Sequence, residues 1–350
     1  MTFGCEGFFA GQDKLNTKKM TDYPATRSSW KKHQVQKKWR DLLAAFIVIV
    51  LIFAVLSGFI KSLSFKKYLD KSGWDGRGSF VLALSTSQPS VFIYQKDPKR
   101  MIFLTVNDNF YLPSGQINKP IVKISSVVEE KDGIKFAKIL TLSFGAKIEN
   151  YVIYKDKQNI NEKEAQKMFK NFASPLTPFL ILARPKSFNV QETNITRLDA
   201  LRLWWQVKGL SINQLNLVDL SSYGEEIVFG DSQKVLGVDE VSLNRVIAKY
   251  LETPEIMRKN FKVTIRNASG SSSAAKLATD FVTSVGFDVV RVESQGDRRE
   301  SSVILSGDGG KDSVYLSKLF NCDIVSQAGE ENAGLATVVV GADFARKYFE

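Results

Sequence analysis

The chain has 350 residues, of which 44% are hydrophobic, so it is long enough for two or three domains with their own cores. Its net charge of +11 would suit a nucleic-acid-binding protein, but the basic excess is concentrated in two stretches. Residues 1–41 hold nine Lys/Arg against four Asp/Glu, and residues 61–71 hold four Lys against one Asp. Because this charge flanks an apolar segment, the sequence argues against a nucleic-acid partner.

The apolar segment, residues 42–60, contains no charged side chain. As a helix it would span about 28 Å, close to the hydrocarbon thickness of a bilayer. A cleaved signal peptide is the main alternative, but its apolar core is usually shorter and its preceding tail is usually brief. We therefore expect an uncleaved signal-anchor in a single-pass cell-membrane protein. Residues 1–41 would be a disordered cytoplasmic tail, and the C-terminal domains would be extracytoplasmic, because the more basic flank stays inside.

Side chains suited to metal or nucleophilic chemistry are scarce after this anchor. The single histidine, His33, precedes it, and Cys5 and Cys322 fall on opposite sides of the predicted membrane. The cysteines cannot pair within the chain, and zinc spacing and Ser-His-Asp or Cys-His arrangements are excluded outside. The sequence predicts no cofactor and no metal site. Any chemistry there would rely on carboxylates, Lys, Arg, Tyr or a carboxylate-bound metal.

Residues 75–253 alternate strand and helix patterns, which predicts a central mixed sheet with helices on its faces. The expected strands are 80–84, 91–95, 101–106, 151–154 and 213–219, and the expected helices are 133–144, 161–172, 196–208 and 238–250. The second and third strands would form a hairpin across the five residues 96–100. Three prolines are expected to interrupt residues 175–185.

Residues 260–344 predict a second, smaller domain. Its expected strands are 262–266, 287–293, 303–305 and 337–340, and its expected helices are 273–285 and 311–320. This βαββαβ order favours a small sheet with helices on one face. The predicted fold class is therefore a single transmembrane helix followed by an α+β or α/β ectodomain of two domains.

Three motifs within Val263–Phe344 point to a known family. The stretch opens with a strand and an Asn-containing turn (VTIRNASG), continues after a helix through GFDV, and ends on VVVGADF. It resembles the C-terminal domain of the LytR-CpsA-Psr proteins, a family of bacterial cell-envelope proteins. The middle of the chain looks like a diverged copy of the catalytic domain of that family. The stretches that carry this second resemblance are residues 90–106, 144–154 and 193–220, and together the two resemblances cover about residues 75–344.

The resemblance implies chemistry whose residues this chain lacks. Enzymes of the family move a glycopolymer from a polyprenyl pyrophosphate carrier to peptidoglycan, with Arg contacting phosphate and Asp holding magnesium. The family's Arg position corresponds here to Asp108, in the turn Asn107-Asp108-Asn109, and the family's first Asp falls near Pro89-Ser90. A carboxylate at position 108 would repel a pyrophosphate. We interpret Asp108 as a degenerate site position and predict no catalytic residue.

Two weaker candidate binding sites remain. Asn267, Ser269 and Gly270 precede a helix whose N-terminus could bind an anion, although a capped turn explains the same residues more simply. Trp204 and Trp205 could stack on sugar rings, although their helical spacing favours a core position for at least one of them.

The sequence favours a membrane-anchored cell-envelope protein that is a non-catalytic scaffold or binding protein for a wall polymer, a lipid carrier or partner proteins. One alternative is an active glycopolymer (polyprenyl-pyrophosphate) transferase or pyrophosphatase with relocated Arg and Asp side chains. Another is a cell-division or wall-assembly adaptor that binds only proteins. A deep pocket lined with Arg and carboxylates would favour the enzyme, and a collapsed or acid-lined pocket would favour the scaffold.

Overall fold

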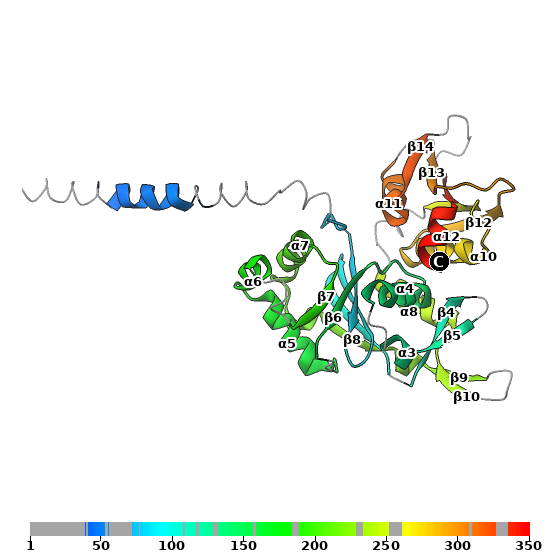
Figure 1. Cartoon of the computed structure of the whole chain (residues 1–350), viewed down its shortest axis with the longest axis horizontal. Helices are drawn as coiled ribbons and strands as arrows, with labels where there is room; N and C mark the ends of the chain where they lie inside the picture. The colour runs from blue at the N-terminus through cyan, green and yellow to red at the C-terminus, as the bar shows by residue number, and fades with distance from the viewer. Residues whose placement is uncertain are drawn as a thin grey trace, which may run out of the picture. The chain divides into compact units, whose positions relative to one another are not determined.

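The structure, a computed structural model, describes residues 39, 41–52, 55, 72–76, 78–107, 109–116, 119–128, 132–156, 159–183, 189–228, 234–251, 261–307, 310–326 and 335–350 (Figure 1). The chain divides into two compact units, Met1–Phe65 and Lys66–Glu350. In the first unit, residues 41–52 are helical. No helix among the described residues has the length and apolar character needed to cross a bilayer. The tail and part of the predicted anchor lie outside the described residues, so the anchor and its orientation stay predictions.

A six-stranded mixed sheet lies at the centre of the second unit, and the mixed α/β character predicted from the sequence is confirmed. Its strands run in the order β7 (Val190–Thr193), β6 (Asn150–Tyr154), β1 (Phe80–Ser85), β2 (Ser90–Lys96), β3 (Lys99–Thr105) and β8 (Leu215–Asp219). β1 pairs in parallel with β6 and β3 with β8, while the remaining neighbours are antiparallel.

The β2–β3 hairpin is tighter than the sequence predicted. Pairing continues to Lys96 and Lys99, so the loop consists of Asp97 and Pro98 alone. The prediction of a five-residue loop was wrong. Charged residues at an exposed strand end still pair through their backbones, and a hydrophobic pattern does not reveal such pairing.

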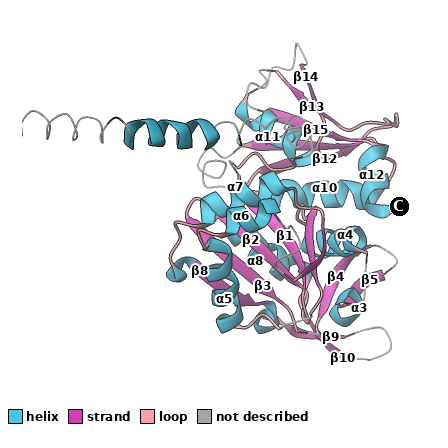
Figure 2. Cartoon of the chain, turned by 60° about the vertical axis from the view of Figure 1, so that its left-hand side comes forward, coloured by secondary structure: helices cyan, strands magenta, loops and turns pink. Residues whose placement is uncertain are grey.

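Helices cover both faces of this sheet (Figure 2). On one face lie α3 (Ile124–Val128), α4 (Gly133–Phe144) and α8 (Glu240–Leu251), and on the other lie α5 (Glu162–Ala173), α6 (Thr177–Ala183) and α7 (Arg197–Val207). Alternate residues of each strand serve the two faces. Val91 and Ile93 of β2 pack with α4 and α8, whereas Phe92 and Tyr94 pack with α5 and α7.

Helix α6 contains Pro178, so the predicted interruption is wrong at that position, whereas Pro175 lies in the turn between α5 and α6 and Pro185 lies outside the described residues. Pro178 occupies the first turn of the helix, where no intrahelical N–H donor is needed. The N–H of Leu180 donates to the Leu176 carbonyl at 3.2 Å, which closes that first turn. The helix therefore begins at Thr177 and continues through the proline instead of ending there.

A second sheet has strand order β5 (Lys119–Lys123), β4 (Tyr111–Gln116), β10 (Lys234–Gly237) and β9 (Glu225–Val228). The sequence analysis missed it because its strands are short, two of them contain a proline, and the β9–β10 pair is largely exposed and charged. Short 3-10 turns, Ile212–Gln214 and Leu220–Tyr223, flank β8.

The C-terminal region forms a five-stranded sheet. Its strand order is β12 (Asp288–Ser294), β11 (Lys262–Asn267), β15 (Leu335–Val340), β13 (Val303–Ser306) and β14 (Asp323–Ser326), and its helices are α10 (Ser272–Ser284), α11 (Lys311–Phe320) and α12 (Ala342–Phe349). The predicted βαββαβ order is present but incomplete, since β14 and α12 were missed. β14 is a short edge strand with exposed residues, and α12 is only two turns long.

Contacts also join the C-terminal elements to the central sheet domain. Leu142 of α4 is part of the C-terminal core cluster. Near it, the Glu149 carboxylate pairs with Lys347 and accepts a hydrogen bond from the Tyr348 hydroxyl at 3.2 Å. Burial acts to raise the pKa of Glu149, but the charges of Lys147 and Lys347 outweigh it and hold that pKa below its usual value. Glu149 is therefore ionised at neutral pH and ties α12 to the central domain.

The first described residues of the second unit, 72–74, are fastened to α7 by one buried carboxylate. Asp199 is 2% exposed, and it accepts hydrogen bonds from the Ser72 hydroxyl at 2.5 Å and from the N–H groups of Gly73 and Trp74 at 3.3 Å. Arg202, one turn later, donates to the Ser72 hydroxyl at 2.6 Å. We call these five residues the Asp199 cluster. It fixes the start of the folded domain on α7.

The Gly-Ala-Asp-Phe motif at 341–344 has a structural explanation. The Asp343 carboxylate accepts hydrogen bonds from the N–H of Ser302 at 2.9 Å and from its hydroxyl at 2.7 Å. The Gly341 N–H donates to that hydroxyl at 2.9 Å, and Phe344 is buried in the C-terminal core. The motif therefore joins β15 and α12 to the start of β13.

Replacing Gly341 by alanine is expected to destabilise the C-terminal domain by about 2 kcal/mol. A Cβ atom at this position would lie 2.5 Å from the backbone carbon of Ser301 and 2.7 Å from the backbone nitrogen of Ser302, and backbone atoms cannot move aside cheaply. Hydrogen exchange of the α12 amides measures the loss. Gly296→Ala is the matched control, because its Cβ would meet nothing within 4 Å. Equal exchange in both variants would contradict the steric argument.

Candidate functional site

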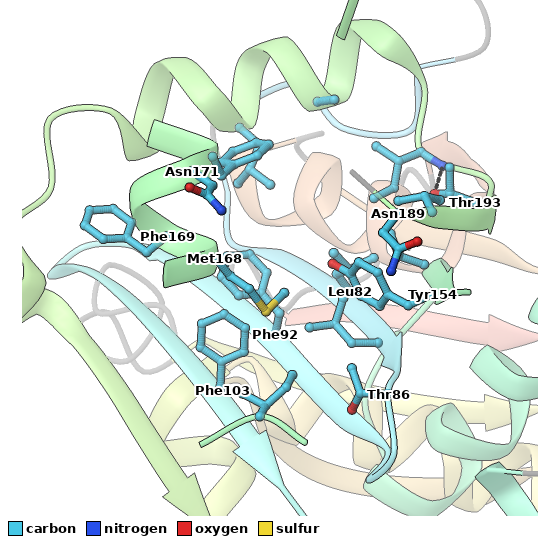
Figure 3. A pocket seen from close by; sticks show the side chains of 18 of the residues that line it. Leu82, Thr86, Phe92, Phe103, Tyr154, Met168, Phe169, Asn171, Asn189 and Thr193 are labelled. Atoms are coloured by element: carbon cyan, nitrogen blue, oxygen red, sulfur yellow. Dashed lines mark hydrogen bonds between the residues drawn. The ribbon is translucent and has the colours of Figure 1, made fainter. Parts of the chain in front are cut away.

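A pocket of about 510 Å³ lies between the central sheet and helices α5, α6 and α7 (Figure 3). This volume is within the range usual for ligand sites, about 300–1,000 Å³. The walls are mainly apolar. They include Leu82, Leu84, Phe92, Phe103, Met168, Phe169, Ile181 and Leu203. Such a lining suits the hydrocarbon part of a ligand.

Polar side chains reach the pocket from a few positions. Asn189, held at a left-handed φ of 59°, donates to the Asp156 carboxylate at 2.7 Å. Lys167 pairs with Glu164 at 3.4 Å, and both line the pocket. Arg197 is the other cation among the described lining residues. These four charged side chains balance one another, so the lining has no net positive charge for an anionic head group.

Tyr154 also lines the pocket, from the end of β6. Burial raises the pKa of its hydroxyl to about 12, so the group is a neutral phenol at physiological pH. It adds an aromatic surface, but no anion, to the wall.

The turn after β3 lies at one end of this sheet. Thr105 pairs with Ser90 and with Asp219, and Thr86 of the pocket follows β1 at the same end. The N–H of Phe110 donates to the Asn107 carbonyl at 3.0 Å, which is an ordinary turn contact. Asp108 lies outside the described residues. Its interpretation as a degenerate site position stays a prediction.

The predicted anion site at Asn267, Ser269 and Gly270 has the contacts of a closed turn. The side-chain Oδ1 of Asn267 accepts from the N–H of Ser269 at 3.1 Å and from the Ser269 hydroxyl at 2.7 Å, while its Nδ2 donates to the Ser271 carbonyl at 3.1 Å. Gly270 has a φ of 77°, which favours glycine. These bonds account for the residues without a ligand, and a binding role stays a prediction.

Trp204 and Trp205 differ in their surroundings. The Trp204 indole N–H donates to the Ser174 carbonyl at 3.0 Å, which links α7 to the segment before α6. Trp205 is 63% exposed, and the Lys208 ammonium lies 3.3 Å from its ring centroid. Neither tryptophan is among the residues that line the pocket. A sugar-stacking role for them stays a prediction.

The sequence analysis did not find the pocket. Its walls are Leu, Phe, Met and Val side chains from strands and helices that the hydrophobic pattern had assigned to the core, and only the packing of α5–α7 on the sheet leaves space between them. The adjacent Met168 and Phe169 were the available signal, and it is weak in a single sequence.

Comparison with known proteins identifies part of the chain. Residues 260–344 match the family model described as "LytR cell envelope-related transcriptional attenuator". No curated protein sequence matches the chain.

Solved structures that resemble the chain have low identity. TagV of B. subtilis is 14% identical, with 48% of this chain and 93% of that chain covered and a TM-score of 0.36. Lin1025 from Listeria innocua is 13% identical over 50% and 97%, with a TM-score of 0.32. The LytR-CPS2A-psr family protein YwtF (TagT), with bound octaprenyl pyrophosphate lipid, is 11% identical over 49% and 88%, with a TM-score of 0.32. The assignment rests on the family model, and residues 260–344 of this chain are accordingly a domain of the LytR cell-envelope family, as their motifs had predicted.

Proposed function

We propose that this chain is a membrane-anchored cell-envelope protein whose middle domain binds the hydrocarbon chain of a polyprenyl lipid carrier without transferring its head group. The observation that carries this proposal is the apolar pocket of about 510 Å³ between the sheet and α5–α7. A linear prenyl chain offers only apolar surface, so a pocket whose affinity comes from burial of such surface suits it.

The charges around the pocket support binding without transfer. Stabilising the charge that develops on a pyrophosphate requires several cations or a metal ion aimed at it. The pocket is open, which by itself fits the enzyme alternative. Its described cations, however, are Lys167 and Arg197, and Lys167 is already paired with Glu164. The sequence adds Asp108 where the family resemblance places an Arg.

The anchor and the C-terminal domain complete the proposed role. The uncharged segment 42–60 would hold the chain in the cell membrane with its N-terminus in the cytoplasm. The LytR-type domain at 260–344 would then lie on the outer side, where a wall glycopolymer or another envelope protein can be its partner. The protein would act as a scaffold that keeps a lipid carrier beside the wall.

Titration of the full-length protein in detergent with octaprenyl pyrophosphate and with octaprenol tests the proposal. We expect saturable binding of both lipids, with affinities that differ by less than about tenfold. The prenyl chain of each lipid provides the contact area, and the head group adds little. Inorganic pyrophosphate should not compete. With magnesium present, no phosphate should be released above the no-protein blank.

Other outcomes favour the alternatives. Release of phosphate, or transfer of a glycan from a lipid-linked precursor, would establish an enzyme with relocated residues. Binding of neither lipid, combined with stable capture of envelope proteins, would favour the protein-only adaptor.

A further inference from the structure

The surface of α6 and α7 exposes four large apolar side chains. Leu176 is 66% exposed, Phe179 69%, Leu180 42% and Trp205 63%. Leu176 immediately precedes α6, and Phe179 and Leu180 follow it by three and four residues, so the first turn of the helix brings the three side chains to one side. The Trp204–Ser174 hydrogen bond holds α7 against the start of α6. Figures 1 and 2 both show α6 beside α7. We call these four residues the α6–α7 surface.

We propose that the α6–α7 surface contacts the head-group region of an anionic phospholipid bilayer. Trp, Phe and Leu combined with basic side chains are the composition of protein surfaces that lie in the membrane interface. Here the Lys208 ammonium lies over the Trp205 ring, at 3.3 Å, and 4.9 Å from the Trp204 ring. In the sequence, residues 165–191 contain four Lys/Arg and no Asp/Glu, and one of these cations, Lys167, is paired with Glu164. Apolar side chains combined with such a basic sequence match lipid tails beside negative head groups.

The point where the chain joins the folded domain favours a bilayer over a protein partner. Eleven residues separate the end of the predicted anchor from Ser72, and so short a segment reaches at most about 40 Å. The Asp199 cluster fastens Ser72 to α7. Trp205 lies on the same helix, six residues after Asp199, which is a rise of about 9 Å. This step rests on the anchor of the proposed function, whereas the exposure and charge of the surface do not.

The inner face of α6 gives the contact a consequence. Ile181, which is 5% exposed, lines the pocket, while Phe179 and Leu180 of the same helix face outward. A bilayer on the outer face would therefore be separated from the pocket by a single helix of two turns, Thr177–Ala183. A lipid chain leaving the membrane would have this short helix as its nearest barrier.

Quenching by brominated lipid in reconstituted vesicles tests the contact. The full-length chain, with Cys5→Ser and Cys322→Ser, is labelled with a fluorophore at Gly209→Cys and inserted into phosphatidylethanolamine vesicles containing phosphatidylglycerol. Gly209 follows Lys208, and a Cβ atom there meets nothing within 4 Å, so the label leaves all four apolar side chains in place. Gly296→Cys, equally open, is the matched control in the C-terminal domain.

We expect brominated lipid to reduce emission about twofold at position 209 and to leave position 296 nearly unchanged. Adding Leu176→Glu with Trp205→Glu should abolish the quenching, whereas Val290→Glu with Val292→Glu, at exposed positions of β12, should not. Vesicles without phosphatidylglycerol should show weaker quenching, because the basic side chains lose their attraction to anionic head groups.

An alkaline wash removes proteins that are not inserted in the bilayer. If chains that remain in the vesicles after this wash show no quenching at position 209, the contact is overturned while the anchor is supported. A signal at 209 that depends on protein density but not on bromine would identify the surface as an interface between two copies, and would also overturn it. The wash reports on the anchor alone, so failure of the anchor and failure of the α6–α7 surface are distinguishable.

Discussion

Replacing Asp199 by alanine is expected to destabilise the central domain by about 3 kcal/mol and to release residues 72–76 from α7. The carboxylate is almost fully buried and accepts hydrogen bonds from three consecutive residues and from the Thr196 hydroxyl at 2.7 Å. Removing it leaves the N–H groups of Gly73 and Trp74 without this acceptor and removes the carboxylate that pairs with the partly buried Arg202 at 3.6 Å. Backbone hydrogen exchange of the peptide that spans 72–84 measures the local effect, and thermal unfolding measures the global one.

Asp297→Ala is the control for this variant, because Asp297 is exposed in a loop of the C-terminal domain. It should leave both measurements unchanged. If Asp199→Ala exchanged no faster than Asp297→Ala in residues 72–84, the Asp199 cluster would not be what holds the start of the domain.

Replacing Ala200 by phenylalanine is expected to lower the affinity for octaprenyl lipid about tenfold or more, equivalent to about 1.4 kcal/mol. Ala200 lines the pocket from α7, one residue beyond Asp199, and a phenyl ring there would occupy space that a prenyl chain needs. The fold should tolerate the change, since the ring fills an existing cavity and buries apolar area. Lipid titration in detergent gives the affinity, and the thermal midpoint gives the stability.

Ala342→Phe provides the matched comparison. Ala342 is similarly half-buried, but it lies at the start of α12 and is not among the pocket residues. It should bind lipid like the unaltered chain. An Ala200→Phe protein that is folded and binds lipid with unchanged affinity would show that the lipid lies elsewhere.

The helices with strong end signals were predicted almost to the residue. α4 begins after Asp132, which caps it, and ends before Gly145, whose φ of 56° terminates the helix. α5 begins at Glu162 and α7 at Arg197, each one residue after its predicted start, and Asn161 and Thr196 cap them. Capping chemistry is local, so a single sequence is enough to identify it.

Elements whose stability comes from distant contacts were missed or shortened. The β9–β10 pair has no apolar alternation of its own and depends on β4, more than a hundred residues earlier in the chain. The short helix α12 is held by Phe344 and Tyr348, which pack against Phe281 of α10. Such contacts follow from tertiary packing and are invisible in windows of local sequence.

The candidate site shows the same limit more strongly. The motifs that identified the family are explained by loop and core contacts, such as those of Asp343 with Ser302. The pocket, in contrast, is an unfilled space, and the side chains around it are of the same types as those in a filled core. Sequence patterns specify which residues avoid water, but not whether the space between them is completely filled.

The attachment of residues 72–74 to α7 has a mechanical consequence. A pull along the segment that leads to the predicted anchor would load the hydrogen bonds of Asp199 before it loads any strand of the sheet. The same helix supplies Ala200, Leu203 and Val207 to the pocket wall. Tension along this segment would thus strain the pocket first, while the strands beneath it kept their register.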